Sequence, residues 1–124
     1  MKKYMEKIEE QIIKAFEARC NDYLTCEVVL SSRDSVEGYN NDIIIYRLDN
    51  NAIFRYEPKE KRFSFTLACY NTPTTRSRLR ALLGYFCNVQ LYMKQGKVYL
   101  VDNDAKIEIG INTWYEFKLR KEVI

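Results

Sequence analysis

The chain contains no histidine and only four glycines, and these shortages exclude several kinds of catalytic site. Without histidine, the chain lacks the commonest general base and the commonest metal ligand in proteins. Its glycines are isolated from one another, so it has no phosphate-cradling loop and no dinucleotide-binding fingerprint. We therefore expect a protein that is not an enzyme and uses no metal or cofactor. An enzyme that uses carboxylates together with lysine or tyrosine is the alternative.

The four cysteines, Cys20, Cys26, Cys69 and Cys87, form no closely spaced pair. Zinc sites normally contain such pairs, so their absence argues against a structural metal. A disulfide framework is conceivable, but a chain of 124 residues is long enough to build a hydrophobic core without one. We interpret the four residues as reduced cysteines in the core, which predicts a cytoplasmic protein.

Long apolar runs are also missing from the chain. No apolar segment approaches the ~18–20 residues of a membrane span, so we expect no membrane partner. The first residues soon become a pattern of acidic and basic side chains, unlike a secretory signal. Hydrophobic residues make up 47% of the chain and charged residues 30%, as is typical of soluble globular proteins. The length predicts a single domain over residues 1–124.

The spacing of apolar residues predicts two helices. From Lys2 to about Arg19, apolar side chains recur every three or four positions, which is typical of an amphipathic helix. The same spacing predicts an internal helix over residues 75–86, with Thr72 or Thr74 as its N-terminal cap. We expect this internal helix to cover one face of a sheet and to be buried with it. The residues expected to be buried together are Phe63, Phe65, Leu79, Leu82 and Phe86.

Short apolar segments predict a mainly antiparallel sheet of about six to eight strands, because the connections between them are short. The predicted strands are 23–30, 42–48, 52–56, 62–67, 89–93, 98–101, 106–111 and 113–119. The chain therefore belongs to the α+β class in this interpretation, with about four strands before the internal helix and about four after it.

Three segments carry more specific expectations. The run Ile43–Ile45 is typical of a strand that is covered on both faces. Residues 62–67 alternate between apolar and polar, which predicts that Ser64 and Thr66 face solvent. Residues 31–41 are polar and show no periodicity, which predicts an exposed and mobile loop.

The net charge of +3 is unevenly distributed along the chain. Residues 59–100 carry eight basic side chains and one acidic side chain, whereas residues 21–58 carry seven acidic and three basic ones. A basic segment of this kind is typical of a surface that contacts an anion, such as nucleic acid or an acidic protein. The alternative is a solvated surface that is merely basic.

The start of the internal helix combines two hydroxyls with three arginines. Free N–H groups and the positive end of the helix dipole favour anions at such a position. We expect Arg76, Arg78 and Arg80 to reach solvent there. The alternative is that these arginines pair with aspartate or glutamate from residues 21–58.

Aromatic residues are abundant, with ten tyrosines, six phenylalanines and one tryptophan. Flat rings interleaved with basic groups suit single-stranded nucleic acid, because bases stack on rings while lysine and arginine follow phosphates. Tyrosine and arginine are also the favoured residues of protein interfaces. The candidate contact residues for either partner are Arg76, Arg78, Arg80, Lys61, Arg62, Lys94, Lys97, Tyr92 and Tyr99.

Two segments, Asn71–Leu83 and Gln90–Tyr99, resemble small uncharacterised bacteriophage proteins. In those proteins a Thr-Thr-Arg/Lys-x-Arg helix start precedes a Gln/Lys-Gly hairpin with an aromatic strand. The resemblance covers about a quarter of the chain. It implies an origin in a phage or mobile element, and it assigns no activity and no site.

Two main functional hypotheses follow from these patterns. In the first, a non-enzymatic phage protein contacts nucleic acid through the basic face of residues 59–100. In the second, a protein–protein module, such as a phage inhibitor or accessory factor, acts on a host protein or forms a homodimer. The direction of the arginines distinguishes them. A continuous positive surface supports the first hypothesis, and arginines paired with the acidic segment support the second.

Overall fold

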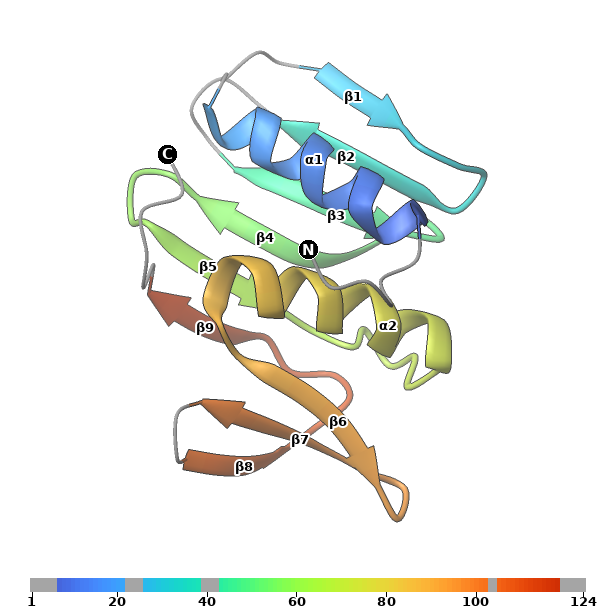
Figure 1. The fold of residues 1–124 in the computed structure, drawn as a ribbon, viewed down its shortest axis with the longest axis vertical. Helices are drawn as coiled ribbons and strands as arrows, with labels where there is room; N and C mark the ends of the chain where they lie inside the picture. Colours follow the sequence, from blue (N-terminus) through green and yellow to red (C-terminus); the bar gives the residue numbers. More distant parts are fainter. Residues whose placement is uncertain (1–6, 22–25, 39–42, 103–104, 119–124) are drawn as a thin grey trace.

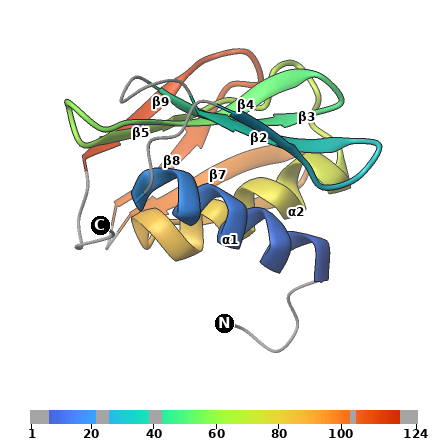
Figure 2. The same ribbon diagram turned by 90° about the horizontal axis from the view of Figure 1, so that it is seen from above.

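The structure, a computed structural model, describes residues 7–21, 26–38, 43–102 and 105–118. Six antiparallel strands form the larger sheet, and a smaller sheet of three strands extends beyond the second helix (Figure 1). Both helices lie on the same side of the larger sheet (Figure 2). The predicted α+β class and the antiparallel pairing are therefore confirmed.

The described residues form nine strands, one more than the upper limit predicted. The larger sheet contains, in spatial order, β1 (Cys26–Val29), β2 (Asp34–Gly38), β3 (Ile44–Leu48), β4 (Asn51–Glu57), β5 (Arg62–Phe65) and β9 (Tyr115–Lys118). The smaller sheet contains β6 (Gln90–Lys94), β7 (Lys97–Asp102) and β8 (Ala105–Ile109). The helical elements are α1 (Lys7–Asn21), α2 (Pro73–Leu82) and the π-helical turn η1 (Leu83–Cys87).

Both predicted helices are present with shifted bounds. Residues 2–6 of the first prediction lie outside the described residues, and α1 continues two residues beyond the predicted end. The second helix begins at Pro73 because the Thr72 side chain caps it by accepting a hydrogen bond from the backbone N–H of Thr75. Thr72 is one of the two caps that the sequence allowed. Neither described helix is long and apolar enough to cross a membrane.

Aromatic rings form the centre of the core, between the larger sheet and the helices. The ring centroid of Phe16 lies 5.1 Å from that of Phe54 and 5.3 Å from that of Phe86. Phe63 extends this cluster, at 5.4 Å from Phe86. The predicted common core is confirmed. Its fully buried members are Phe63, Phe65, Leu79, Leu82 and Phe86.

The prediction of an exposed loop at residues 31–41 is wrong for residues 34–38, whereas Ser32 and Arg33 are exposed and lie outside the strands, as predicted. Asp34–Gly38 forms β2, which lies between β1 and β3 in the larger sheet. Its two acidic side chains are buried because remote partners pair with them: Arg78 with Asp34, and Arg47 with Glu37 at 2.6 Å. Val36 is fully buried in the core. Residues 39–41 of the predicted loop lie outside the described residues.

Two predictions about sheet faces are also wrong. Ile45 is half-buried while Ile44 is buried, so β3 alternates and is not fully covered on both faces. Ser64 is buried instead of facing solvent, because Arg55 on the neighbouring strand donates a hydrogen bond to its hydroxyl. The Trp114 ring stacks on the same arginine, with its centroid 3.7 Å from the guanidinium carbon. Thr66 is buried as well, and its hydroxyl accepts a hydrogen bond from a backbone N–H.

The cysteines follow the prediction only in part. Cys20 and Cys87 are buried in the core as predicted. Burial and the neighbouring Glu17 raise the pKa of the Cys20 thiol to about 12, so this thiol stays protonated. The prediction is wrong for Cys69, which is exposed. This residue lies in a tight turn, where its φ is 69°. The side chain of Cys26 lies outside the described residues.

Candidate nucleic-acid interface

The nine predicted contact residues do not form one continuous surface. Tyr92, Lys94, Lys97 and Tyr99 lie on the β6–β7 hairpin, and the three arginines lie on α2. The β4–β5 turn, which carries Lys61, is separated from that hairpin by most of the molecule (Figure 1). The basic segment of the sequence is therefore divided among three parts of the fold.

Arg78 is buried and pairs with Asp34 of β2, with Nε 3.0 Å from Oδ1. The expectation that this arginine reaches solvent is wrong, and the alternative, pairing with the acidic segment, holds for it. Burial raises the pKa of the Asp34 carboxyl, but hydrogen bonds from Ser31, Tyr46 and Arg78 outweigh this effect and hold the pKa below its usual value. The positive charge of Arg78 is therefore neutralised by Asp34 inside the protein and does not contribute to a surface that could contact an anion.

Arg76 is also buried, which again contradicts the expected exposure. Its Nη1 donates hydrogen bonds to the backbone carbonyl of Asn71, at 3.1 Å, and to the Asn71 side-chain oxygen, at 2.6 Å. Arg80 is exposed, and its Nε donates a hydrogen bond to the carbonyl of Leu91 in β6, at 3.0 Å. The arginines of α2 thus hold neighbouring segments of the chain in place.

The two predicted contact residues on the β4–β5 hairpin differ in exposure. Lys61 is exposed in the turn. Arg62 is half-buried between two carboxylates, at 3.3 Å from Glu57 and 3.7 Å from Glu116. These acidic neighbours offset the charge of Arg62, so this hairpin presents little net positive charge.

The other four predicted residues gather on one face of the smaller sheet. The β6–β7 register places Tyr92 opposite Tyr99 and Lys94 opposite Lys97. The two tyrosine rings are stacked, with centroids 5.5 Å apart. Lys106 of β8 joins them, with its Nζ 4.7 Å from the centroid of the Tyr99 ring. We call these five residues the Tyr–Lys face.

The opposite side of the smaller sheet belongs to the core. Its buried residues are Leu91, Val98, Leu100 and Ile109. Side chains alternate between the two sides of a strand, so the core side fixes the direction of the Tyr–Lys face toward solvent. The tyrosines are half-exposed, and the lysines are exposed.

The Tyr–Lys face is electropositive. Its three lysines share this side of the sheet with Glu108, whose carboxylate lies 4.0 Å from Lys97 Nζ. Both groups are more than half exposed, so solvent weakens this ion pair and leaves the lysine available. Hydrogen bonding to Tyr92 raises the pKa of Lys106, so this lysine is fully charged at neutral pH.

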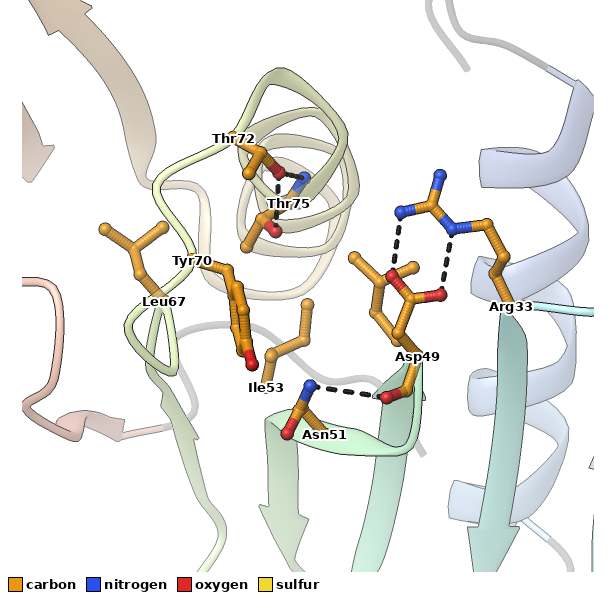
Figure 3. Close-up of a pocket in the computed structure, with 9 residues that line it drawn as sticks. Arg33, Asp49, Asn51, Ile53, Leu67, Tyr70, Thr72 and Thr75 are labelled. Atoms are coloured by element: carbon orange, nitrogen blue, oxygen red, sulfur yellow. Dashed lines mark hydrogen bonds and ion pairs between the residues drawn. The ribbon is translucent and has the colours of Figure 1, made fainter.

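A cavity of about 210 Å³ lies where the strands β2, β3 and β4 meet the start of α2 (Figure 3). It is lined by Arg33, Leu48, Asp49, Asn51, Ile53, Leu67, Tyr70, Thr72 and Thr75. Arg33 and Asp49 form a paired contact on its rim, with Nε–Oδ1 and Nη2–Oδ2 distances of 2.9 and 2.8 Å. Within the described part of the chain, no three cysteine, aspartate or glutamate side chains group as a metal site would require.

Comparison with protein families matches residues 5–118 to the family described as Kyanoviridae Gp96 protein. The chain belongs to this family. Because it is a family of phage proteins, the predicted phage origin is confirmed. Comparisons with curated proteins and with solved structures found no match. The matched residues include the whole Tyr–Lys face and every residue that lines the cavity.

Sequence reasoning missed Lys106 in this member of the Kyanoviridae Gp96 family. The alternation of residues 105–109 places Lys106 and Glu108 on one side of a strand and Ile107 and Ile109 on the other. That signal was present in the sequence. The sequence does not say which of these two sides of β8 lies beside the tyrosines. The pairing of β8 with β7 decides this, because it sets Lys106 opposite Val101 and Glu108 opposite Tyr99.

Proposed function

We propose that this member of the Kyanoviridae Gp96 family is a non-enzymatic phage protein that binds single-stranded nucleic acid through the Tyr–Lys face. The arginines of α2 do not form the expected continuous positive surface, and Arg78 pairs with the acidic segment, so the proposal is carried by the smaller sheet instead. The observation that supports it most is the stacked Tyr92–Tyr99 pair, with three lysines on the same side of that sheet. In the proposal the protein acts in the cytoplasm of the infected bacterial cell.

The physical reason is that the two kinds of side chain match the two parts of a single strand. Bases of any sequence stack on aromatic rings, because every base has a flat π-face, and each stacked base contributes ~1–3 kcal/mol. Lys94, Lys97 and Lys106 are positioned to contact the phosphates beside those bases. In a duplex the bases are already stacked, so their faces are closed to Tyr92 and Tyr99, and the face favours single strands.

The test is binding of a labelled single-stranded oligonucleotide, measured by fluorescence anisotropy at several salt concentrations. A variant with Lys94, Lys97 and Lys106 changed to glutamine should bind more weakly. The slope of the logarithm of its affinity against the logarithm of the salt concentration should become less steep by about two units, because each lost phosphate contact removes roughly 0.7 from this slope. A matched variant with three exposed lysines elsewhere, Lys14, Lys59 and Lys61, changed to glutamine has the same net charge and should bind almost as the wild type does.

Two results would contradict the proposal. One is equal weakening by the two triple variants, because binding would then depend on net charge and not on this face. The other is no binding by the wild-type protein below ~100 µM at low salt, where even non-specific binders usually register.

A second candidate function is self-association or binding to a host protein, as a phage inhibitor or accessory factor would do. The observation that favours it is the outer edge of β8, the last strand of the smaller sheet, with which no other described strand pairs. Next to this edge, Ile107 is 49% and Ile111 46% exposed, although both are large and apolar. Exposed strand edges bind further strands through backbone hydrogen bonds.

The test of self-association is light scattering after gel filtration. The wild-type protein should be a dimer, and Ile107→Lys should convert it to a monomer. A monomeric wild type would argue against self-association.

A further inference from the structure

The cavity beside α2 has walls of different chemistry. Figure 3 shows Tyr70 on one side and the Arg33–Asp49 pair on the other, with Asn51 below and Thr75 above. The Tyr70 side chain is large, apolar over most of its surface and 54% exposed, so its ring is available to a ligand. Leu48, Ile53 and Leu67 supply the apolar part of the lining.

The two buried arginines of α2 fix opposite walls of this cavity. Arg76 holds Asn71, the residue after Tyr70, through the two hydrogen bonds described above. Arg78 holds Asp34, the residue after Arg33. The backbone N–H of Asp49 also donates to the carbonyl of Arg33, at 2.8 Å, which ties β2 to the β3–β4 turn. Hydrogen bonds and an ion pair within the protein therefore fix the walls of the cavity without a ligand.

The turn that presents Tyr70 adopts a backbone conformation that its residues disfavour. Ala68 and Cys69 have φ values of 53° and 69°, and the Tyr70 N–H donates to the carbonyl of Leu67. A turn with two successive positive φ values normally contains glycine, asparagine or aspartate. Such strain persists only where the surrounding structure holds it, and it is common at ligand sites. Here it directs the side chains of Leu67 and Tyr70 into the cavity.

The size and lining of the cavity suit a single planar heterocycle. Its volume of about 210 Å³ lies below the ~300–1,000 Å³ of pockets for drug-sized ligands. An exposed ring and aliphatic side chains suit the flat faces of a base. The carboxamide of Asn51, whose nitrogen uses one N–H on the carbonyl of Asp49, offers an acceptor oxygen and a second N–H donor for its polar edge. A nucleobase combines these features.

The cavity lies near β6, the strand that carries Tyr92 and Lys94 of the Tyr–Lys face. The Asn71 side chain lies 3.9 Å from the sulfur of Met93 in β6. Because side chains alternate along a strand, Met93 is on the opposite side of β6 from Tyr92 and Lys94. The start of α2 and the end of β6 lie on the same side of the molecule (Figure 1). A strand that leaves the Tyr–Lys face near the β6–β7 turn then passes round the edge of β6 to reach Tyr70.

We propose that the cavity binds one unstacked base of the strand that the Tyr–Lys face holds, with Tyr70 stacking on the base and Asn51 hydrogen-bonding to its edge. This inference rests on the proposed function. Arg76 and Arg78 are then positioning residues, because they hold the cavity walls and do not contact the base.

The test compares Tyr70→Ala and Tyr70→Phe with the wild-type protein, using the same labelled oligonucleotide. Tyr70→Ala should weaken binding about tenfold, within the range of one lost stacking contact, with an unchanged salt dependence. Tyr70→Phe keeps the ring and should bind as the wild type does. Val29→Ala, which truncates a side chain 68% exposed on β1, is the control for a surface substitution and should have no effect. Equal thermal midpoints would show that all variants are folded.

A second readout separates this inference from the proposed function. In nitrogen-15 NMR spectra, the side-chain amide of Asn51 should shift when the oligonucleotide is added. Wild-type binding with an unmoved Asn51 amide, and full affinity in Tyr70→Ala, would overturn the cavity proposal and leave the Tyr–Lys face intact. Absence of wild-type binding would overturn both.

Discussion

Removal of Arg78 should destabilise the protein far more than removal of a surface arginine. Arg78→Met keeps most of the apolar stem and deletes the guanidinium that faces Asp34. The side chains of the two partners are only 10% and 1% exposed, so water cannot replace the lost contact. Breaking a buried ion pair from one side costs about 3–5 kcal/mol, because the other charge stays buried without its partner. We expect the lower end of this range, since Tyr46 and Ser31 still donate hydrogen bonds to Asp34.

The measurement is urea unfolding followed by circular dichroism, with the free energy of unfolding extrapolated to water. Arg33→Met is the matched control, because Arg33 also pairs with an aspartate, Asp49, but both side chains are about half exposed. That control should lose less than ~1 kcal/mol. Adding Asp34→Asn to Arg78→Met removes the buried charge and should restore part of the lost stability. A loss below ~1 kcal/mol in Arg78→Met would refute the reasoning.

The same pair predicts a pH dependence. Burial raises the pKa of Asp34, but its hydrogen bonds and Arg78 outweigh burial, so the pKa in the folded protein lies below the usual 3.8. A carboxyl with a lowered pKa stabilises the fold above its unfolded-state pKa, and this stabilisation is lost as the pH falls through the folded-state value. The wild type should therefore lose stability below about pH 4. Arg78→Met should show a smaller acid loss, because it removes one of the groups that lower this pKa.

The remaining predictions concern the core, β2 and the thiols. Leu82→Ala should cost ~2–5 kcal/mol in urea unfolding, because the side chain is fully buried, and a loss below ~1 kcal/mol would show that α2 is not docked on the sheet. Backbone amides of β2 that lie in its two strand ladders should exchange hydrogen slowly, and rapid exchange across residues 34–38 would contradict its place inside the sheet. A thiol reagent mapped by mass spectrometry should label Cys69 quickly and Cys20 only after unfolding, and equal rates would contradict their different exposure.

Elements that depend on neighbouring residues were predictable from the sequence. The spacing of Leu79, Leu82 and Phe86 defined the buried face of α2 and η1, and Thr72 was among the two candidate caps. The hairpin of β6 and β7 followed from a short turn between two apolar segments. These features are local because a helix face, a cap and a tight turn each form within a few residues of the chain.

Contacts between remote residues were decided only by the tertiary structure. Residues 34–38 look like a loop because their polar side chains suggest exposure, yet Arg78 lies 44 positions from Asp34 and neutralises it in the core. That pairing removed Arg78 from the surface, and hydrogen bonds to Asn71 removed Arg76. Strand register brought Lys106 to the tyrosines, and the folding of three strands against α2 formed the cavity. Composition along the chain records which charges are present, but only the fold determines which of them cancel inside the protein and which remain for a ligand.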